Sequence, residues 1–216
     1  MCKPEDFPFP QVSAPSPCFP GKEQTMRLRL IPLLISVLLG FPCHASAEPE
    51  VHVDYEYYEI RGETADQLRQ AMNAQGTVWK NRKTYDAYTS WNVSWSFDRR
   101  TGKGGCHVDS VKTVVKVTHR FPKWKDRLFA SLDLQEKWTA YMKALKEHEN
   151  GHRDLAVGAA REIEWSLTNL DASPNCEEIR IRANALAREI LQNYREQEAA
   201  YDAMTRFGET QGAVFP

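Results

Sequence analysis

Two histidines, His148 and His152, stand one helical turn apart within the stretch KALKEHENGHRDLA, residues 143–156. Residues four apart share a face of an α-helix, with Cβ atoms roughly 6 Å from each other, so two imidazoles can direct ring nitrogens at one point. Glu149 is rotated by about 100° from the first histidine, so its carboxylate borders that point without occupying it. This is the H-E-x-x-H pattern of zinc proteases. The metal polarises a water and the carboxylate takes its proton, as hydrolysis of an amide requires.

The two histidines continue the apolar stripe of a long predicted helix. From about Ser131 to Leu170 the apolar residues recur at steps of three and four, and the steps from Leu145 to Leu155 pass through both histidines. Inert, hydrogen-bonded core histidines are the alternative, but two desolvated imidazoles beside a glutamate favour a metal site. Gly151, inside this helix, costs about 1 kcal/mol relative to alanine. It indicates either close approach of a backbone or substrate, or a packing notch.

A catalytic zinc needs a third protein ligand, for which several candidates exist. A metzincin would have a histidine six residues beyond the second one, but that position is Gly158, so this class is excluded. A second long helix is predicted from about Glu177 to Met204. If the two helices form an antiparallel hairpin turning near residue 172, Glu198 is the nearest carboxylate and Asp202 lies a turn or two further. Histidines of the N-terminal half are further candidates: His52, His107 and His119.

The segments ahead of the long helices have the pattern of strands. VHVDYEYYEIRG alternates, and YTSWNVSWSF and CHVDSVKTVVKVTHRFP are rich in β-forming residues, with DRRTGKGG as a hairpin connection between them. A short helix is predicted after the first strand, because Thr64 can cap it and Gly76 ends it. We therefore expect an α+β fold: a small, mostly antiparallel sheet with one short helix, followed by two long antiparallel helices, the first carrying H-E-x-x-H.

The first 47 residues are predicted to be processed rather than folded. Residues 26–47, MRLRLIPLLISVLLGFPCHASA, have the basic start, apolar stretch and small-residue site of a secretory signal peptide. The apolar stretch falls short of the roughly 20 residues needed to span a bilayer, so we expect no stable membrane span after cleavage. An uncleaved signal anchor is the alternative. Residues 1–25 are predicted to be a non-native extension, which leaves 48–216 as a zinc-protease-like domain.

The charge and cysteine content are consistent with an exported protein that binds no nucleic acid. The formal net charge is −1, and no basic run follows the predicted signal peptide, which argues against a nucleic-acid or anionic-lipid surface. Two cysteines remain after cleavage, Cys106 and Cys176. In a secreted or periplasmic protein they are expected to form a disulfide that ties the strand region to the start of the last helix, the alternative being two reduced thiols.

Several segments resemble a bacterial domain-of-unknown-function family described as predicted secreted zinc-dependent proteases. The similar segments cover nearly all of the mature chain: YYEIRGETADQLRQAM, TSWNVSWSF, CHVDSVKTVVKV, WTAYMKALKEHENGH and AAYDAMTRFGETQGAVFP. The resemblance implies that His148 and His152 are zinc ligands and that Glu149 is the base. It therefore supports the zinc site that the helical spacing indicates.

The end of the chain bears on the third ligand. Asp202 and Thr205 fit the ending of the family, so the resemblance favours Asp202 over Glu198 as the ligand. The family often has a histidine before the glycine of this ending, where this sequence has Phe207. The chain departs from the family's pattern at that position.

Together these features predict an exported zinc metallopeptidase that acts on a peptide or protein. A strand edge within 108–118 is expected to align an extended peptide by strand addition, and Tyr201 or Tyr194 to donate a hydrogen bond to the developing oxyanion. The alternative is a non-catalytic periplasmic zinc-binding or assembly module on the same fold, in which four protein ligands close the zinc site.

Overall fold

The computed structural model describes residues 48–78 and 83–216; the predicted extension (1–25) and signal peptide (26–47) lie outside the described residues. A small sheet comes first and long helices follow, which confirms the predicted α+β class. In the described part of the chain, no helix combines the length and apolarity needed to cross a membrane. The elements, with two short 3₁₀ turns η1 and η2, are β1 (Glu50–Ile60), α1 (Ala65–Gln75), β2 (Thr77–Val78), β3 (Thr84–Tyr85), β4 (Tyr88–Gly102), β5 (Gly105–Trp124), η1 (Arg127–Phe129), α2 (Leu132–Thr168), α3 (Cys176–Thr205) and η2 (Glu209–Gln211).

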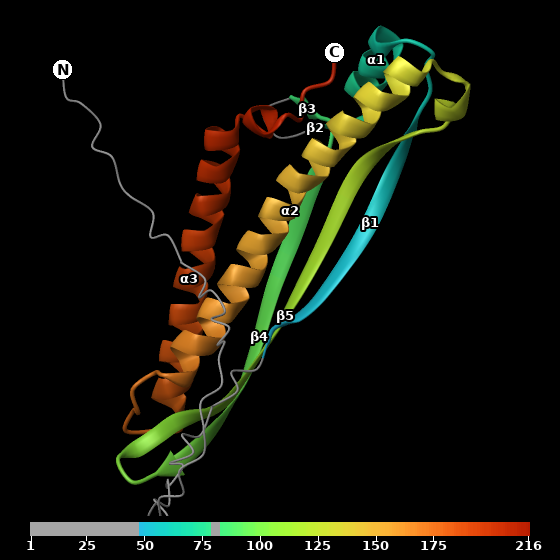
Figure 1. Ribbon diagram of the computed structural model, residues 1–216. Helices are drawn as coiled ribbons and strands as arrows, with labels where there is room; N and C mark the ends of the chain where they lie inside the picture. Colours follow the sequence, from blue (N-terminus) through green and yellow to red (C-terminus); the bar gives the residue numbers. More distant parts are fainter. Residues whose placement is uncertain (1–47, 79–82) are drawn as a thin grey trace, which may run out of the picture. The chain divides into compact units, whose positions relative to one another are not determined.

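The main sheet has the strand order β1-β5-β4, so the longest strand, β5, is central (Figure 1). β4 and β5 form an antiparallel hairpin, whose turn uses Gly104 and Gly105 at φ 97° and 119°, conformations that side chains other than glycine disfavour. β2 and β3 form a separate antiparallel pair. β1 pairs with β5 in parallel, across a connection that contains α1 and the β2–β3 pair. The sheet structure is thus mostly antiparallel, as predicted, with one parallel pairing.

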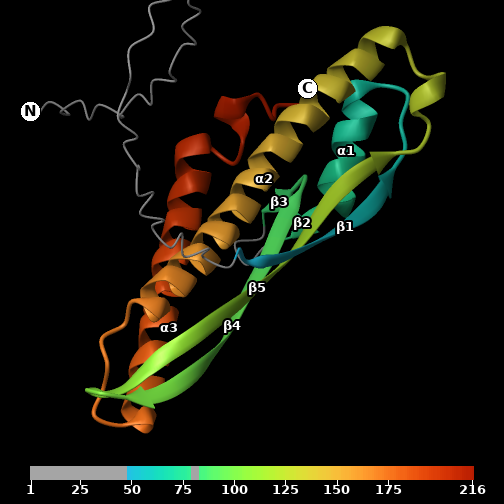
Figure 2. The ribbon, with the colours of Figure 1, turned by 60° about the horizontal axis from the view of Figure 1, so that its bottom comes forward.

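The long helix α2 lies over one face of the sheet with α3 beside it (Figures 1 and 2). The side-chain hydroxyl of Ser131 caps α2 by accepting from the backbone N–H of Leu134. The small side chains of Ala156, Ala159 and Ala160 on α2 are fully buried and allow the sheet and α3 to approach closely. The core of this region is completed by residues from the sheet, α2 and α3: Val93, Val115, Val117, Ile163, Leu167, Ala183, Ala187 and Ile190.

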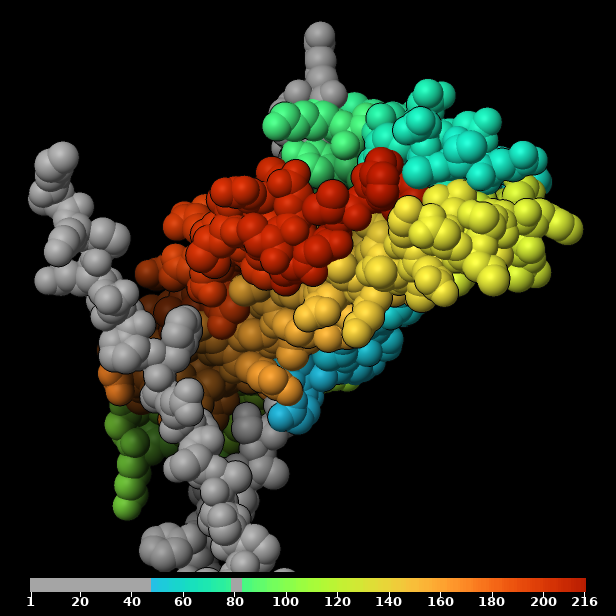
Figure 3. All heavy atoms as spheres, turned by 45° about the horizontal axis from the view of Figure 1, so that its top comes forward, coloured from blue at the N-terminus to red at the C-terminus, as the bar shows by residue number. Residues whose placement is uncertain are grey.

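A second core holds the C-terminal segment against the first half of α2. The ring of Phe215 packs edge-on against Trp138 and lies 5.1 Å from the ring of Tyr141, both on α2. Leu68 and Met72, the buried residues of α1, belong to the same cluster. In Figure 3 the C-terminal residues (red) lie against the yellow N-terminal part of α2 and the neighbouring green segment. This packing fixes the chain end against the N-terminal part of α2.

The disulfide between Cys106 and Cys176 is formed, which confirms the predicted pairing. It joins the start of β5 to the first residue of α3, and a short antiparallel bridge between Cys106 and Ser173 reinforces the same connection. The first turn of α3 is therefore anchored to the sheet. This anchor determines where α3 begins along α2.

The expectation of an exposed strand edge within 108–118 is wrong for the part nearest the histidines. Residues 114–118 lie in the centre of the sheet and pair with β1 on one side and with β4 on the other. Residues 108–113 pair with β4 alone, so their other side is an edge, but this edge is far from the histidines. Thr113 contacts Glu164, which lies roughly 22 Å along α2 from Glu149. In the main sheet, the edge that runs past the histidines belongs to β4.

Candidate metal centre

Three side-chain atoms converge between α2 and α3. Nε2 of His148 lies 3.4 Å from Nε2 of His152. Oδ1 of Asp202, on α3, lies 3.4 Å from the first nitrogen and 3.2 Å from the second. A tetrahedral zinc with bonds of about 2.0–2.1 Å separates its ligand atoms by about 3.3 Å. The three atoms therefore have the spacing of three corners of a zinc tetrahedron, so these residues fit a divalent metal.

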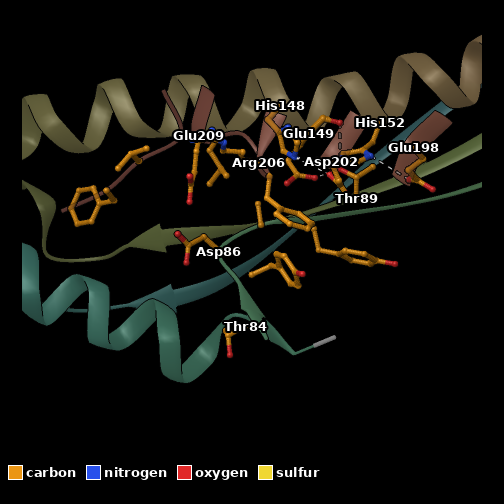
Figure 4. A pocket seen from close by; sticks show the side chains of 18 of the residues that line it. Thr84, Asp86, Thr89, His148, Glu149, His152, Glu198, Asp202, Arg206 and Glu209 are labelled. Atoms are coloured by element: carbon orange, nitrogen blue, oxygen red, sulfur yellow. Dashed lines mark hydrogen bonds and ion pairs between the residues drawn. The ribbon is translucent and has the colours of Figure 1, made fainter. Parts of the chain in front are cut away.

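The donors face a cavity of about 750 Å³, which leaves room for a fourth ligand and a substrate (Figure 4). His148 and His152 are buried, whereas the Asp202 side chain is 27% exposed. The cavity lies between the two long helices, the start of β4 and the C-terminal segment. A zinc held by these three donors would have a fourth position open to the cavity, which is characteristic of catalytic rather than structural zinc sites.

The ring of His148 is held from the side opposite the donors. Its Nδ1–H donates to Oε1 of Gln211 at 3.0 Å, which leaves Nε2 as the nitrogen that faces a metal. Tyr201 stacks on the ring at 5.0 Å, and its hydroxyl donates to the His148 carbonyl. Gly208, at φ 88°, approaches so closely that a Cβ there would lie 3.1 Å from Cγ of His148. The C-terminal segment thus fixes the tautomer and orientation of this histidine.

His152 is oriented by Glu198, the carboxylate that the predicted helical hairpin placed nearest to the two histidines. Oε1 of Glu198 lies 3.3 Å from Nδ1 of His152, an ion-pair contact outside hydrogen-bond geometry, and it accepts from the indole N–H of Trp91 at 2.8 Å. Glu198 therefore contacts the nitrogen that faces away from the donor cluster. Carboxylates in this position behind a ligating histidine raise its basicity.

Electrostatics at the cluster favour a cation. Burial lowers the pKa of His152, but its contacts with Asp202 and Glu198 outweigh this effect and raise the pKa to about 9. Burial raises the pKa of Asp202, and the two histidines overcome it, lowering the pKa to about 2. Without metal, a proton on His152 compensates the carboxylates at neutral pH. A divalent cation bound to the three donors would replace that proton.

Glu149 lies beside the three donors but is not one of them. It is buried, lines the cavity, and accepts from the Thr89 hydroxyl at 2.5 Å through Oε2. Burial raises the pKa of Glu149, an effect that the Thr89 hydrogen bond and the two histidines partly oppose. A carboxylate whose pKa is raised toward neutrality suits a general base.

The remaining candidates from the sequence lie away from the donor cluster. His52 is exposed and pairs with Glu50, and His107 lies beside Gly102 at the hairpin turn. His119 is fully buried in β5, where its Nδ1 contacts Thr89.

Neither tyrosine expected to bind an oxyanion lines the cavity. Tyr201 donates to the His148 carbonyl, and Tyr194 packs against Gly158 further along α2. The tyrosines that do line the cavity are Tyr85 and Tyr88. Sequence reasoning missed these two, as it missed Thr89 and Gln211; the only signal was that Thr89 and Gln211 occur within segments that carry the family resemblance.

Asp202 rather than Glu198 completes the group of three donors. α2 ends at Thr168 and α3 begins at Cys176, so the connection is centred on residue 172 and α3 begins within one residue of its predicted start. Both carboxylates contact His152, but Oδ1 of Asp202 lies beside Nε2 of both histidines, whereas Oε1 of Glu198 lies beside Nδ1 of His152.

Asp202→Asn and Glu198→Gln are expected to affect zinc binding differently. Structural zinc sites with four ligands bind with about 10–16 kcal/mol, or roughly 3 kcal/mol per ligand. Asp202→Asn should therefore weaken zinc binding by about two orders of magnitude, whereas Glu198→Gln, which alters a contact to His152, should cost about tenfold. Competition with a chromogenic chelator measures both. A larger loss from Glu198→Gln would contradict the assignment of Asp202 as the donor.

Gly151→Ala is expected to disturb the site through Tyr201. A Cβ at this position would lie 2.3 Å from the Tyr201 hydroxyl oxygen, so the glycine is a packing notch for that ring. The substitution should destabilise the protein by about 1–3 kcal/mol, against the gain of about 1 kcal/mol usual for glycine to alanine in a helix. Urea unfolding measures the effect. The control compares Gly151→Ala combined with Tyr201→Ala against Tyr201→Ala alone, because removing the ring removes the atoms that the new Cβ would approach. If Gly151→Ala alone stabilises the protein, Gly151 is not a packing notch for the Tyr201 ring.

Comparison with known proteins places the chain in a family. A family model described as "Bacterial protein of unknown function (DUF922)" matches residues 55–208, which include most of the sheet, α1 and the three donors. Searches of curated proteins and of solved structures found no match. The family description assigns no metal and no activity. The chain therefore belongs to the bacterial family of unknown function DUF922.

Proposed function

We propose that this protein is an exported zinc metallopeptidase. The observation that carries the proposal is the spacing of three donors, His148, His152 and Asp202, which fits a tetrahedral zinc beside an open cavity. Glu149 borders these donors as a buried carboxylate outside their set. The disulfide agrees with secretion or a periplasmic location, because such bonds persist in oxidising compartments.

The zinc would supply a Lewis acid that polarises the peptide carbonyl and acidifies a water. Glu149 accepts the proton of that water and then delivers it to the amine that leaves. Because burial and the charges of Glu198 and Glu149 raise the pKa of Tyr88, its phenol stays protonated at neutral pH. Tyr88 lines the cavity and can donate to the oxygen on which negative charge develops.

The edge of β4 is the natural place for the peptide substrate. β4 pairs with β5 on one side, and among the described residues no strand pairs with it on the other. Its first residues, Tyr88 and Thr89, line the cavity. An extended peptide added to this edge would bring successive carbonyl groups past the donors, with main-chain hydrogen bonds providing affinity.

Phe207, the departure from the family's ending, does not interrupt this arrangement. Its ring lies 5.1 Å from that of Tyr85 at the cavity lining, and it is 46% exposed. It is outside the group of three donors. A histidine at this position is therefore not needed to complete the proposed zinc site.

Metal analysis combined with a cleavage assay tests the proposal. We expect one zinc per protein, cleavage of unfolded proteins or of an internally quenched peptide library, loss of cleavage with a chelator, and recovery when zinc is returned. Zinc at one equivalent without cleavage of any peptide would support a binding or assembly module instead. Protein that binds no zinc would refute both functions.

A further inference from the structure

Beneath the proposed base lies a buried polar pair that the metal cluster does not use. Thr89 on β4 and His119 on β5 are directly opposite each other in the antiparallel register, so their side chains share the sheet face toward α2. Thr89 is 5% exposed and His119 is 0% exposed. The Thr89 hydroxyl lies between His119 Nδ1, at 2.7 Å, and Glu149 Oε2, at 2.5 Å.

One hydroxyl hydrogen between two close partners restricts where the other hydrogens lie. The Thr89 hydroxyl donates to Oε2 of Glu149, and a hydroxyl has only one hydrogen to donate. The Thr89 oxygen then faces Nδ1 of His119 at hydrogen-bond distance, and this contact is favourable only if Nδ1 carries the hydrogen. Burial and the charges of Arg153 and His152 lower the pKa of His119. A neutral His119 therefore has its hydrogen on Nδ1 and a lone pair on Nε2.

Packing alone does not explain why a histidine occupies position 119 in the core. Its Nε2 is buried without a hydrogen-bond partner in the described part of the chain, and its ring neighbours are Tyr55 and Phe121. Buried polar atoms are normally hydrogen-bonded, so a nitrogen left without a partner costs free energy. Among the described residues, His119 hydrogen-bonds to the Thr89 hydroxyl, which leads on to Glu149.

We propose that Thr89 and His119 are positioning residues for Glu149. The Nδ1–H of His119 orients the Thr89 hydroxyl, which donates to Oε2 and holds the carboxylate, leaving Oε1 available to the cavity as the oxygen that accepts the proton. The catalytic consequence rests on the proposed peptidase function, whereas the hydrogen-bond chain and the tautomer of His119 do not.

Two matched pairs of variants test the catalytic part. Thr89→Val keeps the shape of threonine but removes the hydroxyl, and Thr89→Ser keeps the hydroxyl. His119→Leu removes the donor, and His119→Asn places an amide N–H near the position of Nδ1. We expect kcat to fall about 10–100-fold in Thr89→Val and about tenfold in His119→Leu. KM and zinc content should stay near the parent values, and Thr89→Ser and His119→Asn should recover most of kcat.

Nitrogen-15 NMR of histidine-labelled protein tests the chain without an activity assay and without a variant that must fold. The His119 signals, assigned in the parent by their through-space contacts with the rings of Tyr55 and Phe121, should show a protonated Nδ1 and an unprotonated Nε2 in the metal-free protein. A proton on Nε2 instead would overturn the proposal. Parental kcat in Thr89→Val would overturn the positioning role while the peptidase function stands. If the parent protein cleaves no peptide, the proposed peptidase function is refuted. The NMR result still tests the hydrogen bonds from His119 through Thr89 to Glu149.

Discussion

Glu149→Gln is expected to lower kcat/KM for peptide cleavage by about three orders of magnitude and to leave the zinc in place. A carboxamide cannot take a proton from water at neutral pH, and general acid–base catalysis contributes roughly 10²–10⁴-fold. Zinc content should not change, because the three donors do not include this residue. The Thr89 hydroxyl can donate to the amide oxygen as it does to Oε2. Parallel measurement of cleavage and of zinc separates the two effects.

Glu147→Gln is the matched control. Glu147 is on the same helix two residues earlier and is exposed, so the same chemical change there should leave both quantities within a factor of about two. Loss of zinc in Glu149→Gln would show that the carboxylate is a ligand. Retained cleavage in Glu149→Gln would exclude its role as base. A parent protein that binds zinc but shows no cleavage to lose would instead indicate a binding module.

Removal of the disulfide is expected to lower the free energy of unfolding by about 4 kcal/mol. Cys106 and Cys176 are separated by 70 residues, and closing a loop of that length in the unfolded chain costs about this much conformational entropy. The bond also anchors the first turn of α3, the helix that carries Asp202. The double variant Cys106→Ser, Cys176→Ser should therefore bind zinc more weakly as well as unfold at lower denaturant concentration.

Urea titrations with and without a reductant measure this effect. The parent should lose stability when the reductant is added, whereas the double serine variant should be insensitive to it. If the two proteins unfold at the same urea concentration under oxidising conditions, the disulfide contributes nothing to stability. Weakened zinc binding without a change in stability would mean that the bond acts on α3 alone.

Much of the architecture followed from local patterns. The 3.6-residue periodicity predicted α2 from about Ser131, which proves to be its cap, and Thr64 caps α1 as expected. The period-two alternation and the glycine-rich link predicted the β4–β5 hairpin. The parallel pairing of β1 with β5 could not be predicted in this way, because a parallel partner is joined by a long crossover and no local turn specifies it.

The pair of histidines and the adjacent glutamate are specified by helical spacing alone, since a separation of four residues places two side chains on one face wherever the helix packs. The third donor depends on the level at which two helices meet. A shift of α3 by one helical turn along α2 would exchange Glu198 for Asp202 beside the two histidines. The level at which the two helices meet depends on the disulfide and on packing between distant segments. Thr89, His119 and Gln211 come from β4, β5 and the C-terminal segment. Their meeting around one helix is a property of three-dimensional contacts, which short-range spacing does not encode.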